Sequence, residues 1–129
     1  MLTDKFYKEL GKLFYAVAII DGEINPKEFN ELKNLVVTDL VPLDEKEDKF
    51  GTDSAFLTEF EFEIFQEMNI SSEKAYSSFI AYYNQNEIYF TIKVKEIILK
   101  IADSIANSFK GKNKLESDFL IRLKSDLKM

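Results

Sequence analysis

The sequence predicts an all-α fold, a single compact bundle of about six helices that spans residues 1–129 as one domain. Three observations support this prediction. Apolar residues recur at helical spacing, helix-capping residues precede several of these segments, and a glycine separates two helices near each end. The chain has 129 residues, of which 46% are hydrophobic, so it has the usual size of one domain and can fill a core.

An apolar stripe predicts that the first helix ends near Ile20. The stripe advances in alternating steps of four and three residues, which places its members on one helical face. The members are Phe6, Leu10, Leu13, Val17 and Ile20. Gly22 follows, and because glycine adopts a positive φ at little cost, we expect a tight turn there.

The second helix is expected to run from Pro26 to about Leu40. Asn25 is a suitable cap, proline suits the first helical position, and Glu28 completes a capping box with Asn25. We expect Ile24 to point inward and link the two helices. The expected buried residues of the second helix are Phe29, Leu32, Leu35 and Val36.

The middle of the chain is expected to form a surface loop over residues 41–52, followed by two helices. Asp53 is the expected cap of a helix that reaches about Met68, and Ser71 or Ser72 opens the next helix. The predicted buried side of the first of these helices carries Phe56, Leu57, Phe60, Ile64 and Met68.

Two segments, residues 58–65 and 88–95, alternate between apolar and polar residues as β-strands do, so strand remains an alternative for both. We favour helix, because neither run is closed by a turn signal and the second leads directly into helical spacing. That spacing is carried by Val94, Ile98, Ile101, Ile105 and Phe109.

A last break is predicted at residues 110–113, before a final helix that begins near Lys114. The apolar residues of this helix are Leu115, Phe119, Leu120, Leu123 and Leu127. A long helix, a glycine turn and a shorter helix therefore occur at both ends of the chain. This pattern indicates an internal duplication whose two hairpins pack together.

The residue composition argues against catalysis. The chain has no Cys and no His, which excludes disulfides, thiolate nucleophiles, imidazole bases and the usual zinc sites. Asp21 and Glu28 could act as a carboxylate pair, but no phosphate-binding glycine loop or second ligand set accompanies them. We therefore expect no enzymatic activity.

The charges are unevenly distributed along a chain of formal net charge −6. Residues 41–67 contain nine acidic residues and two lysines, whereas residues 92–129 contain nine basic and five acidic residues. A charge run is usually a solvated face, but this asymmetry predicts a polarised surface that could orient a protein partner. Nucleic acid is not an expected partner, because acidic residues interrupt the basic part.

The apolar runs are too short to cross a bilayer. The longest, residues 13–20, falls well below the roughly 18 residues that a spanning helix needs. Asp4 and Glu9 interrupt the N-terminal segment, so it does not read as a signal peptide. We therefore predict no membrane span and a cytoplasmic location.

The turn around Gly22 is similar to the second half of an EF-hand calcium loop. With Gly22 at the sixth position, Asp21 and Glu28 take the fifth and twelfth positions, which suit them chemically. The same register places Val17 and Ile19 where carboxylates are required. A normal EF-hand is therefore rejected, and a degenerate calcium-binding loop remains an alternative.

The same stretch resembles the signature of TerB-like domains, in which a helix ends in Ala-x-Ala-Asp-Gly-x-Ile and a Glu follows on the next helix. Asp21, Gly22, Ile24 and Glu28 match this signature position by position, while Ile20 replaces the usual alanine. The resemblance implies an all-helical fold, found in tellurite-resistance proteins and fused to DnaJ-type co-chaperones. It also implies a noncatalytic binding or scaffolding module linked to stress responses and membrane-associated complexes.

The segment after Gly111 resembles the second copy of this signature in the family. Lys110 stands where the family has an acid, and one extra residue separates Gly111 from Phe119. The two regions together cover about half of the chain, and the middle fits the family only as generic helices.

Asp21, Glu23 and Glu28 form the candidate site, because they lie within eight residues across the Gly22 turn. Acids near a helix N-terminus are stabilised by its unpaired amides, so helix capping is one sufficient explanation. The other is a weak site for a divalent cation, Ca²⁺ or Mg²⁺, or for a basic partner. A cation site needs further ligands, and the duplication indicates Asp103 or Asp118.

A self-assembling structural protein is a further alternative to the interaction module. It predicts a large exposed aromatic patch, because monomeric proteins rarely expose such a surface. The residues that could form the patch are Tyr82, Tyr83, Tyr89 and Phe90. Aromatic residues at helical spacing more often belong to the core, so the exposure of these four decides between the two interpretations.

Overall fold

The structure, a computed structural model, describes residues 2–44, 49–108 and 111–129, and the side chains of residues 44–53 are outside this description. The described residues form helices and connecting turns without any strand, which confirms the all-α prediction. The α-helices are α1 (Asp4–Ile19), α2 (Pro26–Leu35), α3 (Lys49–Glu67), α4 (Ser72–Gln85), α5 (Ile92–Asn107) and α6 (Lys114–Asp126). A π-helical turn, η1 (Val36–Leu40), extends α2, and 3-10 turns follow at η2 (Val41–Asp44) and η3 (Glu87–Tyr89).

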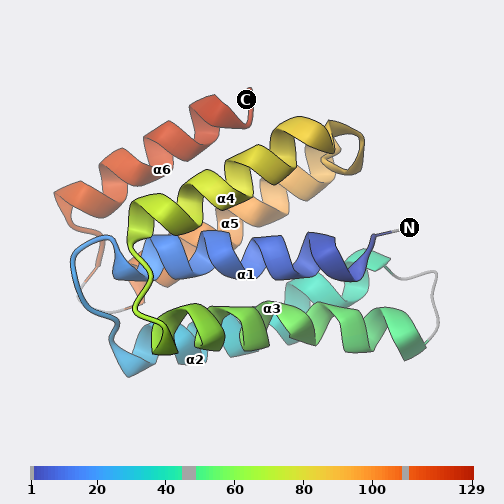
Figure 1. Cartoon of the computed structure of the whole chain (residues 1–129), viewed down its shortest axis with the longest axis horizontal. Coiled ribbons are helices and arrows are strands. Elements are labelled where there is room, and N and C mark those ends of the chain that lie inside the picture. Colours follow the sequence, from blue (N-terminus) through green and yellow to red (C-terminus); the bar gives the residue numbers. More distant parts are fainter. Residues whose placement is uncertain (1, 45–48, 109–110) are drawn as a thin grey trace.

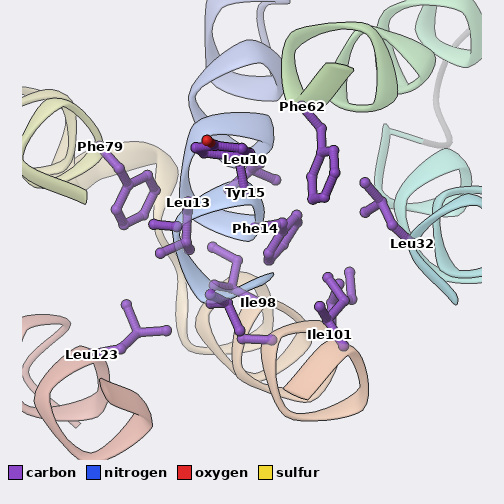
Figure 2. Close-up of a cluster of buried hydrophobic side chains, with 14 of the residues drawn as sticks. Leu10, Leu13, Phe14, Tyr15, Leu32, Phe62, Phe79, Ile98, Ile101 and Leu123 are labelled. Atoms are coloured by element: carbon purple, nitrogen blue, oxygen red, sulfur yellow. The ribbon is translucent and has the colours of Figure 1, made fainter. Parts of the chain in front are cut away.

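Helix α1 lies in the middle of the bundle, with α3 on one side and α4 and α6 on the other, while α5 passes behind α1 and also packs against α2 (Figure 1). The predicted stripe of α1 is buried from Phe6 to Val17, but so are Tyr7, Phe14 and Tyr15 on its other faces. Helix α1 is thus buried on several faces, because neighbouring helices pack around it. Figure 2 shows this arrangement: Phe14 lies toward Leu32 and Phe62, and Leu13 toward Phe79 and Leu123.

Neither alternating segment forms a strand: residues 58–65 are helical throughout, as we favoured, whereas residues 88–95 are helical only from Ile92, after a 3-10 turn that ends at Tyr89 and two non-helical residues. Residues 58–65 lie within α3, and Thr91 caps α5 by accepting a hydrogen bond from the amide of Val94 at 3.2 Å. The hydroxyl of Ser71 caps α4 in the same way, through the amide of Lys74 at 3.1 Å. These caps satisfy amides that the first turn of a helix leaves unpaired.

Helix α3 begins earlier than the sequence indicated. Its first residue is Lys49, so Asp53 lies inside the helix and is not its cap, which corrects that prediction. The predicted loop over residues 41–52 is also too long, because Val41–Asp44 form a 3-10 turn and α3 already includes residues 49–52. Charges and Gly51 suggested a loop, but a helix tolerates both in its first turns.

The predicted buried face of α3 was wrong in three of its five residues. Phe60, Ile64 and Met68 are 59%, 48% and 62% exposed, and the fully buried residues of α3 include Thr58 and Phe62. Phe56 and Leu57 are partly buried against the core. The sequence places apolar residues on two sides of α3, so periodicity alone could not select the side that faces α1.

A close contact between α1 and α3 sets the rotation of α3. A Cβ atom added to Gly11 would lie 2.5 Å from the carbonyl oxygen of Thr58 and 2.9 Å from the Cβ of Glu61, so only glycine fits there. The hydroxyl of Thr58 donates a hydrogen bond of 2.9 Å to the carbonyl oxygen of Tyr7. These contacts turn Thr58 and Phe62 inward and leave Phe60 and Ile64 outward.

The aromatic residues near the end of α4 are not a surface patch. Tyr82, Tyr83 and Phe90 are at most 7% exposed, and Tyr89 packs partly buried against the core. The rings pack edge to face around Phe90, whose centroid lies 4.9 Å from that of Tyr83. The patch expected for a self-assembling protein therefore does not exist at these residues, because they build the core instead.

The terminal hairpins form as predicted, with one exception on α6. Gly22 has φ 106° and Gly111 has φ 78°, and Ile24 packs partly buried against the core. Leu115 is 54% exposed and so is not part of the predicted apolar face, whereas Phe119 and Leu123 are buried. The predictions that involve Phe109 and Lys110 lie outside the described residues. Across the described ranges, no helix is long and apolar enough to cross a membrane.

Candidate functional site

The two glycine turns meet in the structure, as the proposed duplication implied. The side-chain amide of Asn113, at the start of α6, donates a hydrogen bond of 3.3 Å to Oδ2 of Asp21 in the first turn. Residues 20–28 and residues 111–116 therefore form one surface, which we call the paired turns. It is built from the same local element twice, a positive-φ glycine followed by an asparagine-capped helix.

Each of the paired turns contains a complete capping box. Oε1 of Glu28 accepts the amide proton of Asn25 at 2.7 Å, and Oε1 of Glu116 accepts that of Asn113 at 3.0 Å. The two asparagine side chains in turn accept from amides of their own helices, at 2.9 Å in both cases. These bonds form because both sequences place Glu three residues after Asn at a helix start.

The capping glutamates are buried and electrostatically linked through Asp21. Glu28 is 5% exposed and Glu116 is 4% exposed. Burial raises the pKa of Glu28 to about 7, the hydrogen bond from the Asn25 amide opposes that rise, and repulsion from Glu116 and Asp21 adds to it. Burial also raises the pKa of Glu116, again with a contribution from Asp21 and against the bond from Asn113. Asp21 thus destabilises the charged forms of both capping glutamates.

The structure brings together only part of the predicted site. Asp21 and Glu28 share the paired turns, while the exposed Glu23 contributes its amide, which donates to Oδ1 of Asp21 at 3.4 Å. Asp103 is bound by Lys112, and Asp118 pairs with Lys114 at 3.2 Å, so lysines hold both of these carboxylates. Within residues 2–44, 49–108 and 111–129, no group of three or more Asp, Glu, His or Cys side chains is arranged to hold a metal ion.

Glu116 is the member of the paired turns that the sequence-based candidate list missed. The signal for it was present, because Asn113 and Glu116 repeat the spacing of Asn25 and Glu28. The duplication of the two hairpins indicated Asp103 and Asp118 instead. Capping-box spacing would have been the better guide to the second turn.

A second candidate site is the outer face of α3, which we call the α3 surface. Its apolar residues Phe60, Ile64 and Met68 follow one another at intervals of four and form a continuous exposed stripe. An open pocket of 490 Å³ lies on it, lined by Phe60, Glu63, Ile64, Gln66 and Glu67. Residues 50–73 contain six acidic residues and no Lys or Arg, so the stripe lies in an acidic setting.

The α3 surface has the composition of a contact surface. Its apolar side chains project into solvent, and the carboxylates of Glu63 and Glu67 border them. Exposed apolar residues that are contiguous and bordered by charge mark interaction sites more often than scattered ones do.

Comparison of the chain with protein-family models, with curated proteins and with solved structures found no match.

Proposed function

We propose that this chain is a noncatalytic interaction module of the TerB-like kind, which binds a basic segment of a partner protein on its α3 surface. The observation that carries the proposal is the exposure of Phe60, Ile64 and Met68 in an acidic stretch of sequence. The sequence pattern placed these residues in the core, and the fold left them outside. Conflicts of this kind between local pattern and fold are expected at functional sites.

The partner segment is defined by the chemistry of the surface. The stripe of Phe60, Ile64 and Met68 spans about 12 Å along α3, at 1.5 Å of rise per residue. A helix that presents apolar residues at the same interval can pack against it, as in other helix-in-groove complexes. Lys or Arg beside those apolar residues would meet Glu63 and Glu67, and a partner with acids there would be repelled.

The paired turns have a supporting role in this proposal. The capping boxes of Glu28 and Glu116 fix the starts of α2 and α6, and the bond between Asn113 and Asp21 joins the two hairpins. The similarity of residues 16–28 to the TerB-like signature favours a binding or scaffolding module over an enzyme. The proposal includes the stress-related role and the cytoplasmic location expected for such a module.

Peptide binding tests the proposal. The first peptide, the Lys peptide, is an amphipathic helix with Leu at every fourth position and Lys at positions between the leucines. In the second peptide, Glu replaces each Lys. Fluorescence anisotropy should show roughly tenfold tighter binding of the Lys peptide. The variant Phe60→Ala/Ile64→Ala should lose about tenfold of that affinity, since apolar anchors provide most of the binding energy.

Ile88→Ala/Ile92→Ala is the matched control, because both side chains are exposed and belong to η3 and α5 rather than to α3. It should bind the Lys peptide as the unchanged protein does. If the α3 variant and the control bind equally well, attraction to the net charge of the chain explains the binding. That result would refute the α3 surface as the binding site.

A further inference from the structure

A second apolar surface lies between α5 and α6. It is a groove of 390 Å³ lined by Leu99, Leu120 and Ile121, with Lys112 and Lys124 beside them. Ile121 is 69% exposed, although it lies on a helix whose other apolar residues include the buried Phe119 and Leu123. The groove belongs to the part of the chain, residues 92–129, in which basic residues outnumber acidic ones.

The groove and the α3 surface are complementary in both polarity and charge. Each has an exposed apolar centre, but the α3 surface has Glu63 and Glu67 at its pocket, whereas the groove has two lysines, Lys112 and Lys124, and a single acid, Asp103. Lys112 is already paired with Asp103, so we assign the main attraction to Lys124. Opposite charges around apolar centres are the arrangement that selects and orients a partner.

We propose that the groove between α5 and α6 receives the α3 surface of a second copy of this chain. The proposal rests on the proposed function, because it uses the same α3 surface and names its partner. Phe60 and Ile64 of one copy would enter the groove beside Ile121 of the next, and Glu67 would pair with Lys124. Burial of these side chains removes apolar area from water on both copies.

The position of the two surfaces determines the kind of assembly. Helix α3 lies on one side of α1 and helix α6 on the other (Figure 1), and the two surfaces share no residue, so they belong to different parts of the bundle. An interface between different surfaces is heterologous, so a pair of associated copies keeps a free α3 surface at one end and a free groove at the other. Copies therefore associate head to tail, in open chains or in a closed ring. The net charge of −6 opposes association only weakly at physiological salt, where the screening length is about 8 Å.

Two surface variants test the assembly. Phe60→Ser/Ile64→Ser removes the apolar centre of the α3 surface and leaves the groove intact, and Ile121→Glu places a negative charge in the groove and leaves α3 intact. All three side chains are exposed, so both variants should fold, which circular dichroism checks. Sedimentation velocity should show that the mass of the unchanged protein rises with concentration, while each variant alone remains a monomer.

The equimolar mixture of the two variants is the decisive sample. The groove of the α3 variant can accept the α3 surface of the groove variant, and the other two surfaces are inactive. The mixture should therefore form a 1:1 dimer and nothing larger. Ile88→Ser should assemble like the unchanged protein, and association should weaken roughly tenfold as salt is raised from about 0.05 M to about 0.5 M.

The possible outcomes separate this proposal from the proposed function. An unchanged protein that stays monomeric at all concentrations, variants that still associate alone, or a mixture that stays monomeric or exceeds the dimer would each overturn head-to-tail assembly. If the Lys peptide still binds and Phe60→Ala/Ile64→Ala still weakens it, the proposed function stands and the partner is another protein. If the peptide does not bind but the copies assemble as described, the α3 surface is specific for its own groove.

Discussion

Asn113 and Asp21 are 92 positions apart in sequence, yet the side-chain amide of Asn113 donates a hydrogen bond of 3.3 Å to the carboxylate of Asp21. Asn113 uses its other side-chain atom, Oδ1, to cap α6 by accepting the amide proton of Glu116 at 2.9 Å. Asn113 thus caps the second helix of the C-terminal hairpin and also binds that hairpin to the N-terminal one. An aspartate in its place could still cap the helix but could not donate to Asp21.

We predict that Asn113→Asp destabilises the protein by about 1 kcal/mol more than Asn25→Asp does. Both changes keep an acceptor at a cap, but only Asn113→Asp loses a bond between hairpins and places a carboxylate next to Asp21. Urea unfolding measures the difference. Adding Asp21→Asn to Asn113→Asp should restore much of the lost stability, because the new amide at position 21 can then donate a hydrogen bond to the new carboxylate at position 113. If the change in the free energy of unfolding of the double variant equals the sum of the changes in the two single variants, the two turns are not coupled.

Gly22 and Gly11 should respond to substitution for different reasons. A Cβ on Gly22 meets nothing within 4 Å, but the φ of 106° strains any β-branched residue, so Gly22→Val should cost about 1 kcal/mol or more. Gly11→Ala should cost about 1–3 kcal/mol, because its Cβ would collide with the backbone of α3. Thermal unfolding of both variants measures the costs. An unchanged melting temperature for Gly22→Val would show that the turn tolerates an ordinary residue.

The stability of the protein should fall as pH rises from about 4.5 to about 7. The pKa of Glu28 is about 7 in the folded protein, above its ordinary value of 4.5, so the folded state binds more protons than the unfolded state between these values. Glu28→Gln keeps an acceptor for the Asn25 amide and removes the charge. The free energy of unfolding of this variant, relative to that of the unchanged protein, should therefore rise by about 1 kcal/mol or more as pH increases from 4.5 to 8.

Urea unfolding at several pH values measures this gain, and Glu23→Gln, which changes an exposed carboxylate of the same turn, is its matched control. Glu116→Gln should act in the same direction as Glu28→Gln, because burial and Asp21 also raise the pKa of Glu116. If the free energies of unfolding of Glu28→Gln and of the unchanged protein differ by the same amount at all pH values, the charge of Glu28 is not buried as expected.

The paired turns should not bind calcium tightly. Val17 and Ile19 occupy positions where an EF-hand needs carboxylates, and Asp103 and Asp118 are paired with lysines. Calorimetric titration with calcium, magnesium and manganese should show at most weak binding. If binding is saturable, Asp21→Asn/Glu28→Gln should abolish it. If no cation binds and this variant changes only stability, capping alone explains these acids.

The sequence by itself determined that this protein is helical and where α2, α4 and α6 begin. Asn25 with Glu28, Ser71, and the glycines at 22 and 111 act within a few residues of the chain, so their caps and turns could be predicted. The helical interpretation of residues 58–65 was also correct. These features depend on hydrogen bonds and backbone preferences that are local in sequence.

Only the tertiary structure decided which sides of the helices are buried and which distant residues meet. Helix α3 carries apolar residues on two sides, and the close contact at Gly11, a residue of α1, selected the side with Phe62 and left Phe60 exposed. The bond between Asn113 and Asp21 likewise depends on how the two hairpins pack. Burial is a property of the whole bundle, because a helix hides whichever face its neighbours can approach most closely.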